Sequence, residues 1–183
     1  MTLRAAPPAA AFDDPLGALQ ALHRRLESRC GLLERLAEHV GRHGSDADAR
    51  ATAGHVMRCF DEDCPLHDAD LETDLLPLLR AAVPPPEQAR VAALAAALAA
   101  LHADARAAYD AVRPPLAAIA DGRLAKIDRA LAGRLQALCL ARIEREQSEL
   151  LALARAHLDA AALARLGRAM AARRDAAYPS GPE

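Results

Sequence analysis

Aromatic residues are almost absent from this chain of 183 residues: they make up 2% of it, and there is no tryptophan. Strands favour aromatic and β-branched side chains, whereas here most of the 52% hydrophobic content is alanine and leucine, so the chain is predicted to be helical. That content is enough to bury a sizeable core, and the length fits a single domain. A wholly disordered chain is therefore excluded.

A strong charge of one sign is also lacking. The formal net charge is -2 and the pI is about 6.4, so no overall basic field exists to attract nucleic acid or anionic lipid. No apolar run reaches the roughly 18 residues that a membrane span needs, because Arg, Asp or His interrupts the leucine-rich stretches. Residues 1–12 lack the long apolar centre of a secretory signal. We expect a cytoplasmic protein with neither nucleic acid nor membrane as a partner.

The four cysteines match neither a disulfide framework nor the paired spacing of a zinc site, which favours small buried side chains. Cys59 and Cys64 are five residues apart and poorly placed to pair within one helix, although a chain break at Pro65 would let them respond to oxidants. The sequence has no nucleophile elbow, glycine-rich phosphate loop, dinucleotide-binding fingerprint or zinc-protease pair. We therefore expect a protein that is not an enzyme.

Prolines and glycines divide the chain into predicted helices. Asp14 before Pro15 marks a helix start, Gly44 marks a helix end, and the prolines at 84–86 and 114–115 end further segments. The predicted helices cover 14–40, 46–80 with a kink or break at 63–66, 87–112, 124–157 and 160–174, and 116–122 is a short connector. The domain is expected to span 14–174, between a flexible leader, 1–13, and a disordered tail, 175–183.

Four long helices with short connections predict an all-α fold, an antiparallel up-down four-helix bundle with a short C-terminal fifth helix packed as a lid. Each long helix carries an apolar row at steps of three and four residues, and ionisable side chains interrupt each row. The interruptions are His23 in the first helix, Asp68 and Glu72 in the second, His102 in the third, and Arg142 with Glu146 in the fourth. In an antiparallel bundle these positions can share one layer.

The spacing of these polar residues is typical of a metal centre. Asp68 and Glu72, like Arg142 and Glu146, are four residues apart, so each pair projects from one face of its helix. Bundles build carboxylate-bridged metal sites in this way, with carboxylates from facing helices and imidazoles from the others. A single core histidine is usually satisfied by one hydrogen bond, but here the interruptions coincide.

The sequence resembles the bacterial hemerythrin-like (HHE cation-binding) family over most of its length. The residues that carry the resemblance lie in 22–27, 67–77, 101–102 and 142–151. The di-iron family pattern is His, then His-x-x-x-Glu, then His, then His-x-x-x-Glu, with Asp68 and Arg142 here in place of two histidines. The resemblance implies an altered dinuclear site whose candidate metal ligands are His23, Asp68, Glu72, His102 and Glu146. It also implies dioxygen binding, iron handling, or sensing of oxygen, nitric oxide or redox state.

Two functions remain open at this point. A guanidinium has no available lone pair, so Arg142 is not a ligand, and a single ion, iron or another divalent metal, is favoured over a di-iron pair. The first function is non-enzymatic metal binding or oxygen and redox sensing, with dioxygen or another small molecule as a further ligand. The alternative is a metal-free interaction or regulatory module, in which Asp68 and Arg142 form a buried salt bridge.

Three neighbouring residues are assigned secondary roles. His67 is interpreted as flanking the site, although a shift of the helix at Pro65 would turn it inward as a substitute ligand. Glu27 is interpreted as facing solvent, with an added oxygen ligand as the alternative. Tyr109 is either an ordinary core residue or a hydrogen-bond donor to the layer.

Overall fold

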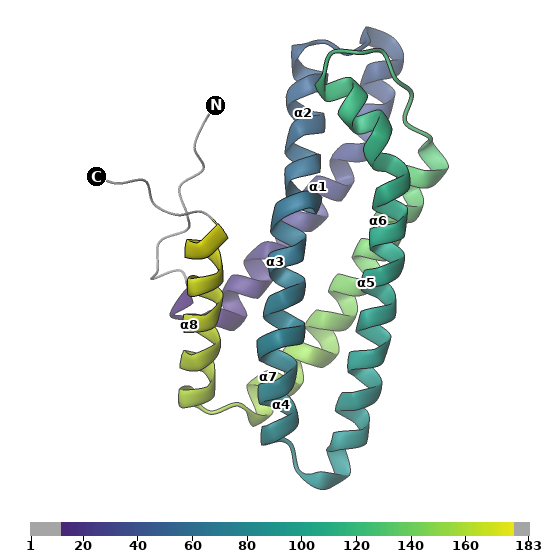
Figure 1. The fold of residues 1–183 in the computed structure, drawn as a ribbon. Helices are drawn as coiled ribbons and strands as arrows, with labels where there is room; N and C mark the ends of the chain where they lie inside the picture. Colours follow the sequence, from purple (N-terminus) through teal and green to yellow (C-terminus); the bar gives the residue numbers. More distant parts are fainter. Residues whose placement is uncertain (1–11, 178–183) are drawn as a thin grey trace, which may run out of the picture.

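The computed structural model describes residues 12–177, and apart from turns, the regular structure in that range is helical (Figure 1). This confirms the all-α prediction. Most of the predicted leader and tail, 1–11 and 178–183, lies outside the described residues. Phe12 is only 7% exposed and its ring lies 5.0 Å from the Arg174 guanidinium, so the packed structure begins inside the predicted leader.

The first helix, α1 (Pro15–His43), begins where the sequence predicts and ends within the predicted stop. The Asp14 carboxylate accepts a hydrogen bond from the amide of Gly17 at 3.0 Å, as an N-cap does. At the other end Gly44 adopts a φ of 72°, a conformation that glycine tolerates without strain. Local chemistry alone therefore sets both ends of this helix.

The second rod is helical from residue 47 to 82, but it contains two wide π-helical turns. Its segments are α2 (Ala47–Arg58), η2 (Cys59–Asp63), α3 (Cys64–Ala69), η3 (Asp70–Leu75) and α4 (Leu76–Ala82). Pro65 and Pro77 each lie just after one of these turns. Proline has no amide hydrogen to donate, and the widened turns carry the helix past it. The predicted disturbance at Pro65 is thus a wide turn rather than a break in the helix.

Three predicted boundaries of the next two helices were wrong: both ends of the third helix and the start of the fourth. α5 (Pro85–Ala120) passes through Pro114 and Pro115 and includes most of the predicted connector, because fully buried Leu116 and Ile119 hold the last turns against the core. α6 (Arg129–Arg145) starts later than the predicted Leu124 and continues through η4 (Glu146–Leu150) and α7 (Leu151–His157). Asp128 sets this later start, since its carboxylate accepts from the amides of Ala130 and Leu131.

One helix, α5, is long and apolar enough by composition to cross a membrane, with a mean hydropathy of 1.3 over its most apolar window. This is weak evidence, because a helix in the core of a protein passes the same test. The buried face of α5 includes Leu94, Leu98 and Val112, which pack in the two core clusters described below.

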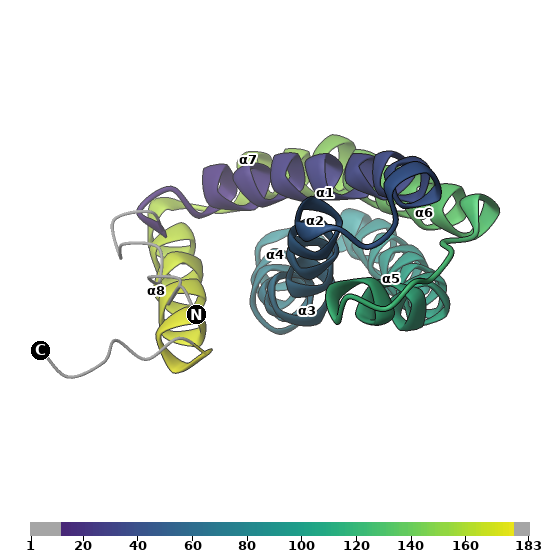
Figure 2. The same cartoon turned by 90° about the horizontal axis from the view of Figure 1, so that it is seen from above.

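Four long rods lie side by side: α1, α2–α4, α5 and α6–α7 (Figure 1). Seen from above, α1 and α6–α7 form one layer, and α2–α4 with α5 form the other (Figure 2). The fifth helix, α8 (Ala160–Ala177), extends past the predicted end at Arg174 and packs on α1 and η3. Arg173 and Arg174 both pair with fully buried Asp70, so arginines of this helix hold it on the other rods.

A polar layer divides the hydrophobic core into two clusters. One cluster lies between the α1 C-terminal half and the α5–α6 connection and includes Leu26, Cys30 and Ile143; the other lies toward α4 and α8 and includes Leu19, Leu71 and Leu150. Between them are five buried polar residues, each at most 8% exposed, which we call the polar layer: His23, His67, His102, Arg142 and Glu146. Four of the six polar residues predicted to share one depth, His23, His102, Arg142 and Glu146, lie in this layer.

Replacing Asp128 with Ala should lower the free energy of unfolding by about 1 kcal/mol, because two amides at the start of α6 lose their acceptor. Urea unfolding followed by circular dichroism measures this. Asp104→Ala is the matched control, since Asp104 is exposed in the middle of α5 and alanine is the better helix former. Equal effects of the two substitutions would contradict the capping role.

Candidate metal centre

Glu146 is the centre of the polar layer. Its Oε2 lies 2.6 Å from Nε2 of His23 and 2.7 Å from Nε2 of His67. Its Oε1 lies 3.1 Å from Nε2 of His102 and 2.7 Å from Nε of Arg142. An ionised carboxylate only accepts hydrogen bonds, so all four nitrogens donate to it. A fully buried carboxylate thus receives one donor from each of the other three rods and one from its own.

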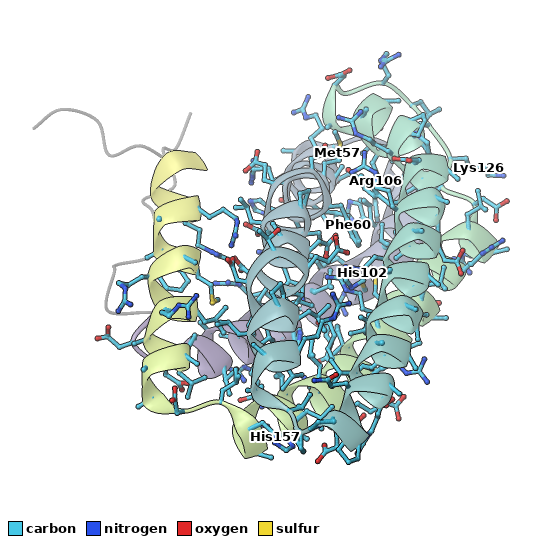
Figure 3. The ribbon with its side chains drawn as sticks, turned by 60° about the horizontal axis from the view of Figure 1, so that its bottom comes forward. Met57, Phe60, His102, Arg106, Lys126 and His157 are labelled. Atoms are coloured by element: carbon cyan, nitrogen blue, oxygen red, sulfur yellow. The ribbon has the colours of Figure 1, made fainter. Side chains whose placement is uncertain are left out.

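Local helix geometry aims these side chains at one point. His23 follows Leu19 and precedes Leu26 on the buried face of α1, at ordinary helical spacing. Glu146 is the first residue of the wide turn η4, whose closing hydrogen bond runs from the Leu151 amide to the Glu146 carbonyl. His102 lies in the middle of α5, in the interior between the helices (Figure 3).

The charge states of these groups follow from their surroundings. Burial by itself raises the pKa of Glu146, but the hydrogen bonds from His102, His23 and His67 outweigh it and hold that pKa well below its ordinary value. Burial lowers the pKa of His67, which is therefore a neutral imidazole. Burial acts the same way on His102, but its hydrogen bond to Glu146 and the nearby Asp68 carboxylate prevail, and the pKa of His102 is raised.

Three of the five predicted ligands, His23, His102 and Glu146, come together in the layer. Asp68 instead forms an ion pair with Nη2 of Arg142, and its side chain is 31% exposed. Glu72 is 53% exposed and its Oε1 lies 3.1 Å from Nδ1 of His102, the ring nitrogen that faces away from Glu146. The structure therefore places Asp68 and Glu72 at the edge of the layer and does not set Glu72 opposite Glu146 as a second bridging carboxylate.

The interpretation of His67 as a flanking residue was wrong. Its side chain is 1% exposed and its ring packs edge-on against that of His23, with centroids 5.2 Å apart. His67 rather than Asp68 faces Glu146, and both residues lie in α3, directly after the wide turn η2. Pro65 was the signal in the sequence, since it pointed to an irregular turn at this place.

The other two secondary assignments are settled by exposure and contacts. Glu27 is exposed on α1, as expected. Tyr109 is buried but does not reach the layer: its hydroxyl donates to Oδ1 of Asp61 at 3.0 Å, and its ring stacks on Phe60. The described hydrogen-bond partners of the layer's imidazoles are carboxylates and one amide.

That amide belongs to Gln147, whose Nε2 lies 3.3 Å from Nδ1 of His23. Nδ1 of His67 has no hydrogen-bond partner among the described residues. Such a buried and unsatisfied polar atom costs about 1–3 kcal/mol. The polar layer is therefore not arranged for stability alone. The imidazole with the unsatisfied nitrogen, that of His67, is one of the two that face Oε2 of Glu146.

The donor atoms of His23, His67 and Glu146 all lie within 4.8 Å of one another, and all three residues are buried. Two imidazole nitrogens and one carboxylate oxygen form a set that suits iron and other divalent transition metals. The residues present thus fit a single metal ion. A second ion next to His102 would meet the Arg142 guanidinium, which already occupies Oε1 of Glu146.

Comparison with known proteins adds no relative: no protein-family model matches the chain, and no curated protein is significantly similar to it. The resemblance to hemerythrin-like proteins rests on the residues quoted above.

Proposed function

We propose that this protein binds one divalent transition metal, with iron as the first candidate, through His23, His67 and Glu146. The observation that carries the proposal is the convergence of three buried donor atoms, from three rods, within 4.8 Å. Neutral imidazole and ionised carboxylate are the forms that bind metal, and His67 and Glu146 are held in these forms. His102 lies outside this group and contacts the other carboxylate oxygen, Oε1 of Glu146, at 3.1 Å.

Three wide turns among the described residues also support a functional layer. η2 and η3 enclose α3, which carries His67, and η4 starts at Glu146 itself. Wide turns of this kind cost regular helical hydrogen bonding and occur frequently at functional sites. The wide turns here border both proposed ligands, His67 in α3 and Glu146 at the start of η4.

Metal binding would require a small rearrangement of protons within the layer. Nε2 of each imidazole now donates to Glu146, so that proton must move to Nδ1 or leave before the nitrogen can bind a metal. Gln147 is suited to this change at His23, because turning its amide by half a rotation presents an oxygen acceptor to Nδ1 instead of a donor. Gln147 is accordingly a positioning residue for His23.

In this proposal the protein is a hemerythrin-like four-helix bundle with a degenerate dinuclear site. One metal position is kept, and the other is filled by Arg142 and its two carboxylate partners. The function would be non-enzymatic, as binding or sensing of iron, dioxygen or redox state, with a small molecule as the additional ligand of the metal.

A second candidate is favoured by Arg142. In its present contacts the guanidinium pairs with Asp68 and Glu146, and Glu146 has a donor for each of its oxygens without any metal. A metal-free bundle stabilised by this network would serve as an interaction or regulatory module. The two candidates differ in one measurable property, the metal content of the protein.

Anaerobic titration with Fe(II), followed by desalting and elemental analysis, tests the proposal. We expect the protein to retain about one equivalent, and His67→Ala to lower the affinity by more than the roughly 10- to 100-fold that loss of an outer hydrogen-bond partner costs. Asp68→Asn is the matched control, since this neighbouring carboxylate is paired with Arg142 and should matter less. Circular dichroism confirms that both variants fold.

The outcomes separate the candidates. If the folded protein retains no metal after reconstitution, the metal-free module is the correct function. If Asp68→Asn abolishes binding and His67→Ala does not, the ligand set predicted from the sequence is right and the one in the structure is wrong.

A further inference from the structure

Outside the polar layer, the four cysteines form two pairs inside the core cluster between α1, α2, α5 and α6. Cys30 (α1) has Cys139 (α6) as its neighbour, and Cys59, the first residue of η2, has Cys64, the first residue of α3. All four are free thiols. Nothing in the proposed metal site uses any of them.

Cys59 and Cys64 were expected to be poorly placed to pair within one regular helix, and the structure has a wide turn between them. In a regular α-helix, residues five apart lie about 140° apart around the axis and about 9 Å apart in Cα position. A disulfide requires Cα atoms within about 7 Å. In η2 the amide of Cys64 donates to the carbonyl of Cys59, which stacks the two residues one above the other. Phe60, the residue after Cys59, packs into the core beside them (Figure 3).

The surroundings of this pair assign different roles to its members. The hydrogen bond from the Cys64 thiol lowers the pKa of Cys59, and Arg29 and Arg25 act in the same direction. The same hydrogen bond, together with burial, raises the pKa of Cys64 well above its ordinary value. Cys59, which is 3% exposed, is therefore the nucleophile of the pair, and Cys64 is its more exposed member.

We propose that Cys59 and Cys64 form a redox-active dithiol that hydrogen peroxide converts to an intrahelical disulfide across η2. The Cys59 thiol loses its proton to solvent, and its thiolate attacks one peroxide oxygen. The O–O bond breaks, sulfenic acid forms at Cys59, and the hydroxide released takes up the proton of the Cys64 thiol to become water. The Cys64 thiolate then attacks the Cys59 sulfur, and the hydroxide that leaves takes up the proton first lost by Cys59 to become a second water. In total two thiols and one peroxide give one disulfide and two waters.

The second pair is not equivalent. Cys30 is 0% exposed and Cys139 is 1% exposed. Their shared hydrogen bond and burial raise the pKa of Cys30, so its thiol stays protonated and unreactive. The proposal does not depend on metal binding, because both the geometry of η2 and the thiol chemistry exist without a metal.

Peroxide treatment of the full chain, in the presence of a chelator, tests the proposal. Thiols that remain are alkylated, and peptide mass spectrometry locates the linked residues. We expect one disulfide, between Cys59 and Cys64, reversed by a dithiol reductant, with Cys30 and Cys139 still alkylated. In Cys64→Ser the reaction should stop at a sulfenic acid on Cys59, trapped by a 1,3-dione probe, and Cys139→Ser should leave the Cys59–Cys64 disulfide unchanged.

Three results would overturn the proposal. They are a disulfide between Cys30 and either Cys139 or Cys59, sulfenic acid on Cys64 in place of Cys59, and four alkylated thiols after peroxide treatment. The wild-type measurement decides the question even if a variant fails to fold. The chelator removes metal throughout, so the two proposals are tested separately. A negative result for the Cys59–Cys64 disulfide does not bear on the proposed metal site, and a negative result for the metal site does not bear on the disulfide.

Discussion

Replacing Glu146 with Ala should destabilise the metal-free protein by about 3–5 kcal/mol and abolish metal binding. The substitution leaves Arg142, which is 4% exposed, with a single partner, and it removes the acceptor that His23, His67 and His102 share. Uncompensated buried charge and unsatisfied buried donors are among the few causes of losses of this size. Urea unfolding with and without chelator measures the first effect, and Fe(II) titration measures the second.

Two further variants identify the cause. Glu149→Ala removes another carboxylate from the same wide turn, but Glu149 and its partner Arg145 are partly exposed, so its loss should cost less than about 1 kcal/mol. Glu146→Gln keeps the shape and one acceptor oxygen, so it should retain more stability than Ala while still weakening metal binding. If Glu146→Ala costs no more than Glu149→Ala, Glu146 does not organise the layer.

The parts of the fold that the sequence predicted are those decided by local chemistry. The start of α1 depends on an Asp14 side chain and its end on the backbone freedom of Gly44, and both are readable from a few residues. The end of α5 is not local. Pro114 and Pro115 remove hydrogen bonds, but the burial of Leu116 and Ile119 against other rods outweighs this, and that gain depends on packing that a sequence does not reveal.

The candidate site could be predicted only in part, at the residues whose inward direction follows from local helical spacing. His23, His102 and Glu146 lie on rows whose spacing stays regular up to each residue, so their inward direction follows from helical periodicity. Asp68 and His67 follow a wide turn, and after it His67 rather than Asp68 faces Glu146. Pro65 indicates that the turn is irregular, but not whether it widens or breaks. The ligand set therefore changed at the rod in which a wide turn comes before the polar residues.

Arg142→Leu should have the second large effect, a loss of about 3–5 kcal/mol in the chelated protein. Arg142 is the only cation of the polar layer that is permanently charged, and its removal leaves Glu146 to the imidazoles and separates Asp68 from its partner. In the metal-loaded protein the loss should be smaller, because a bound divalent ion would compensate the Glu146 charge and stabilise the folded state by its own binding. Unfolding curves at saturating Fe(II), held anaerobic, provide the comparison.

The double variant Arg142→Leu with Asp68→Asn tests the ion pair directly. Since the two residues are in contact, their separate effects should not add: removing the Asp68 charge should recover part of what Arg142→Leu loses, by roughly 0.5–3 kcal/mol. Additive losses would show that the ion pair contributes nothing to stability. Asp68 is partly exposed, so water can replace some of its interaction with Arg142. Equal losses from Arg142→Leu with and without metal would show that no ion compensates Glu146, and they would favour the metal-free module over the metal site.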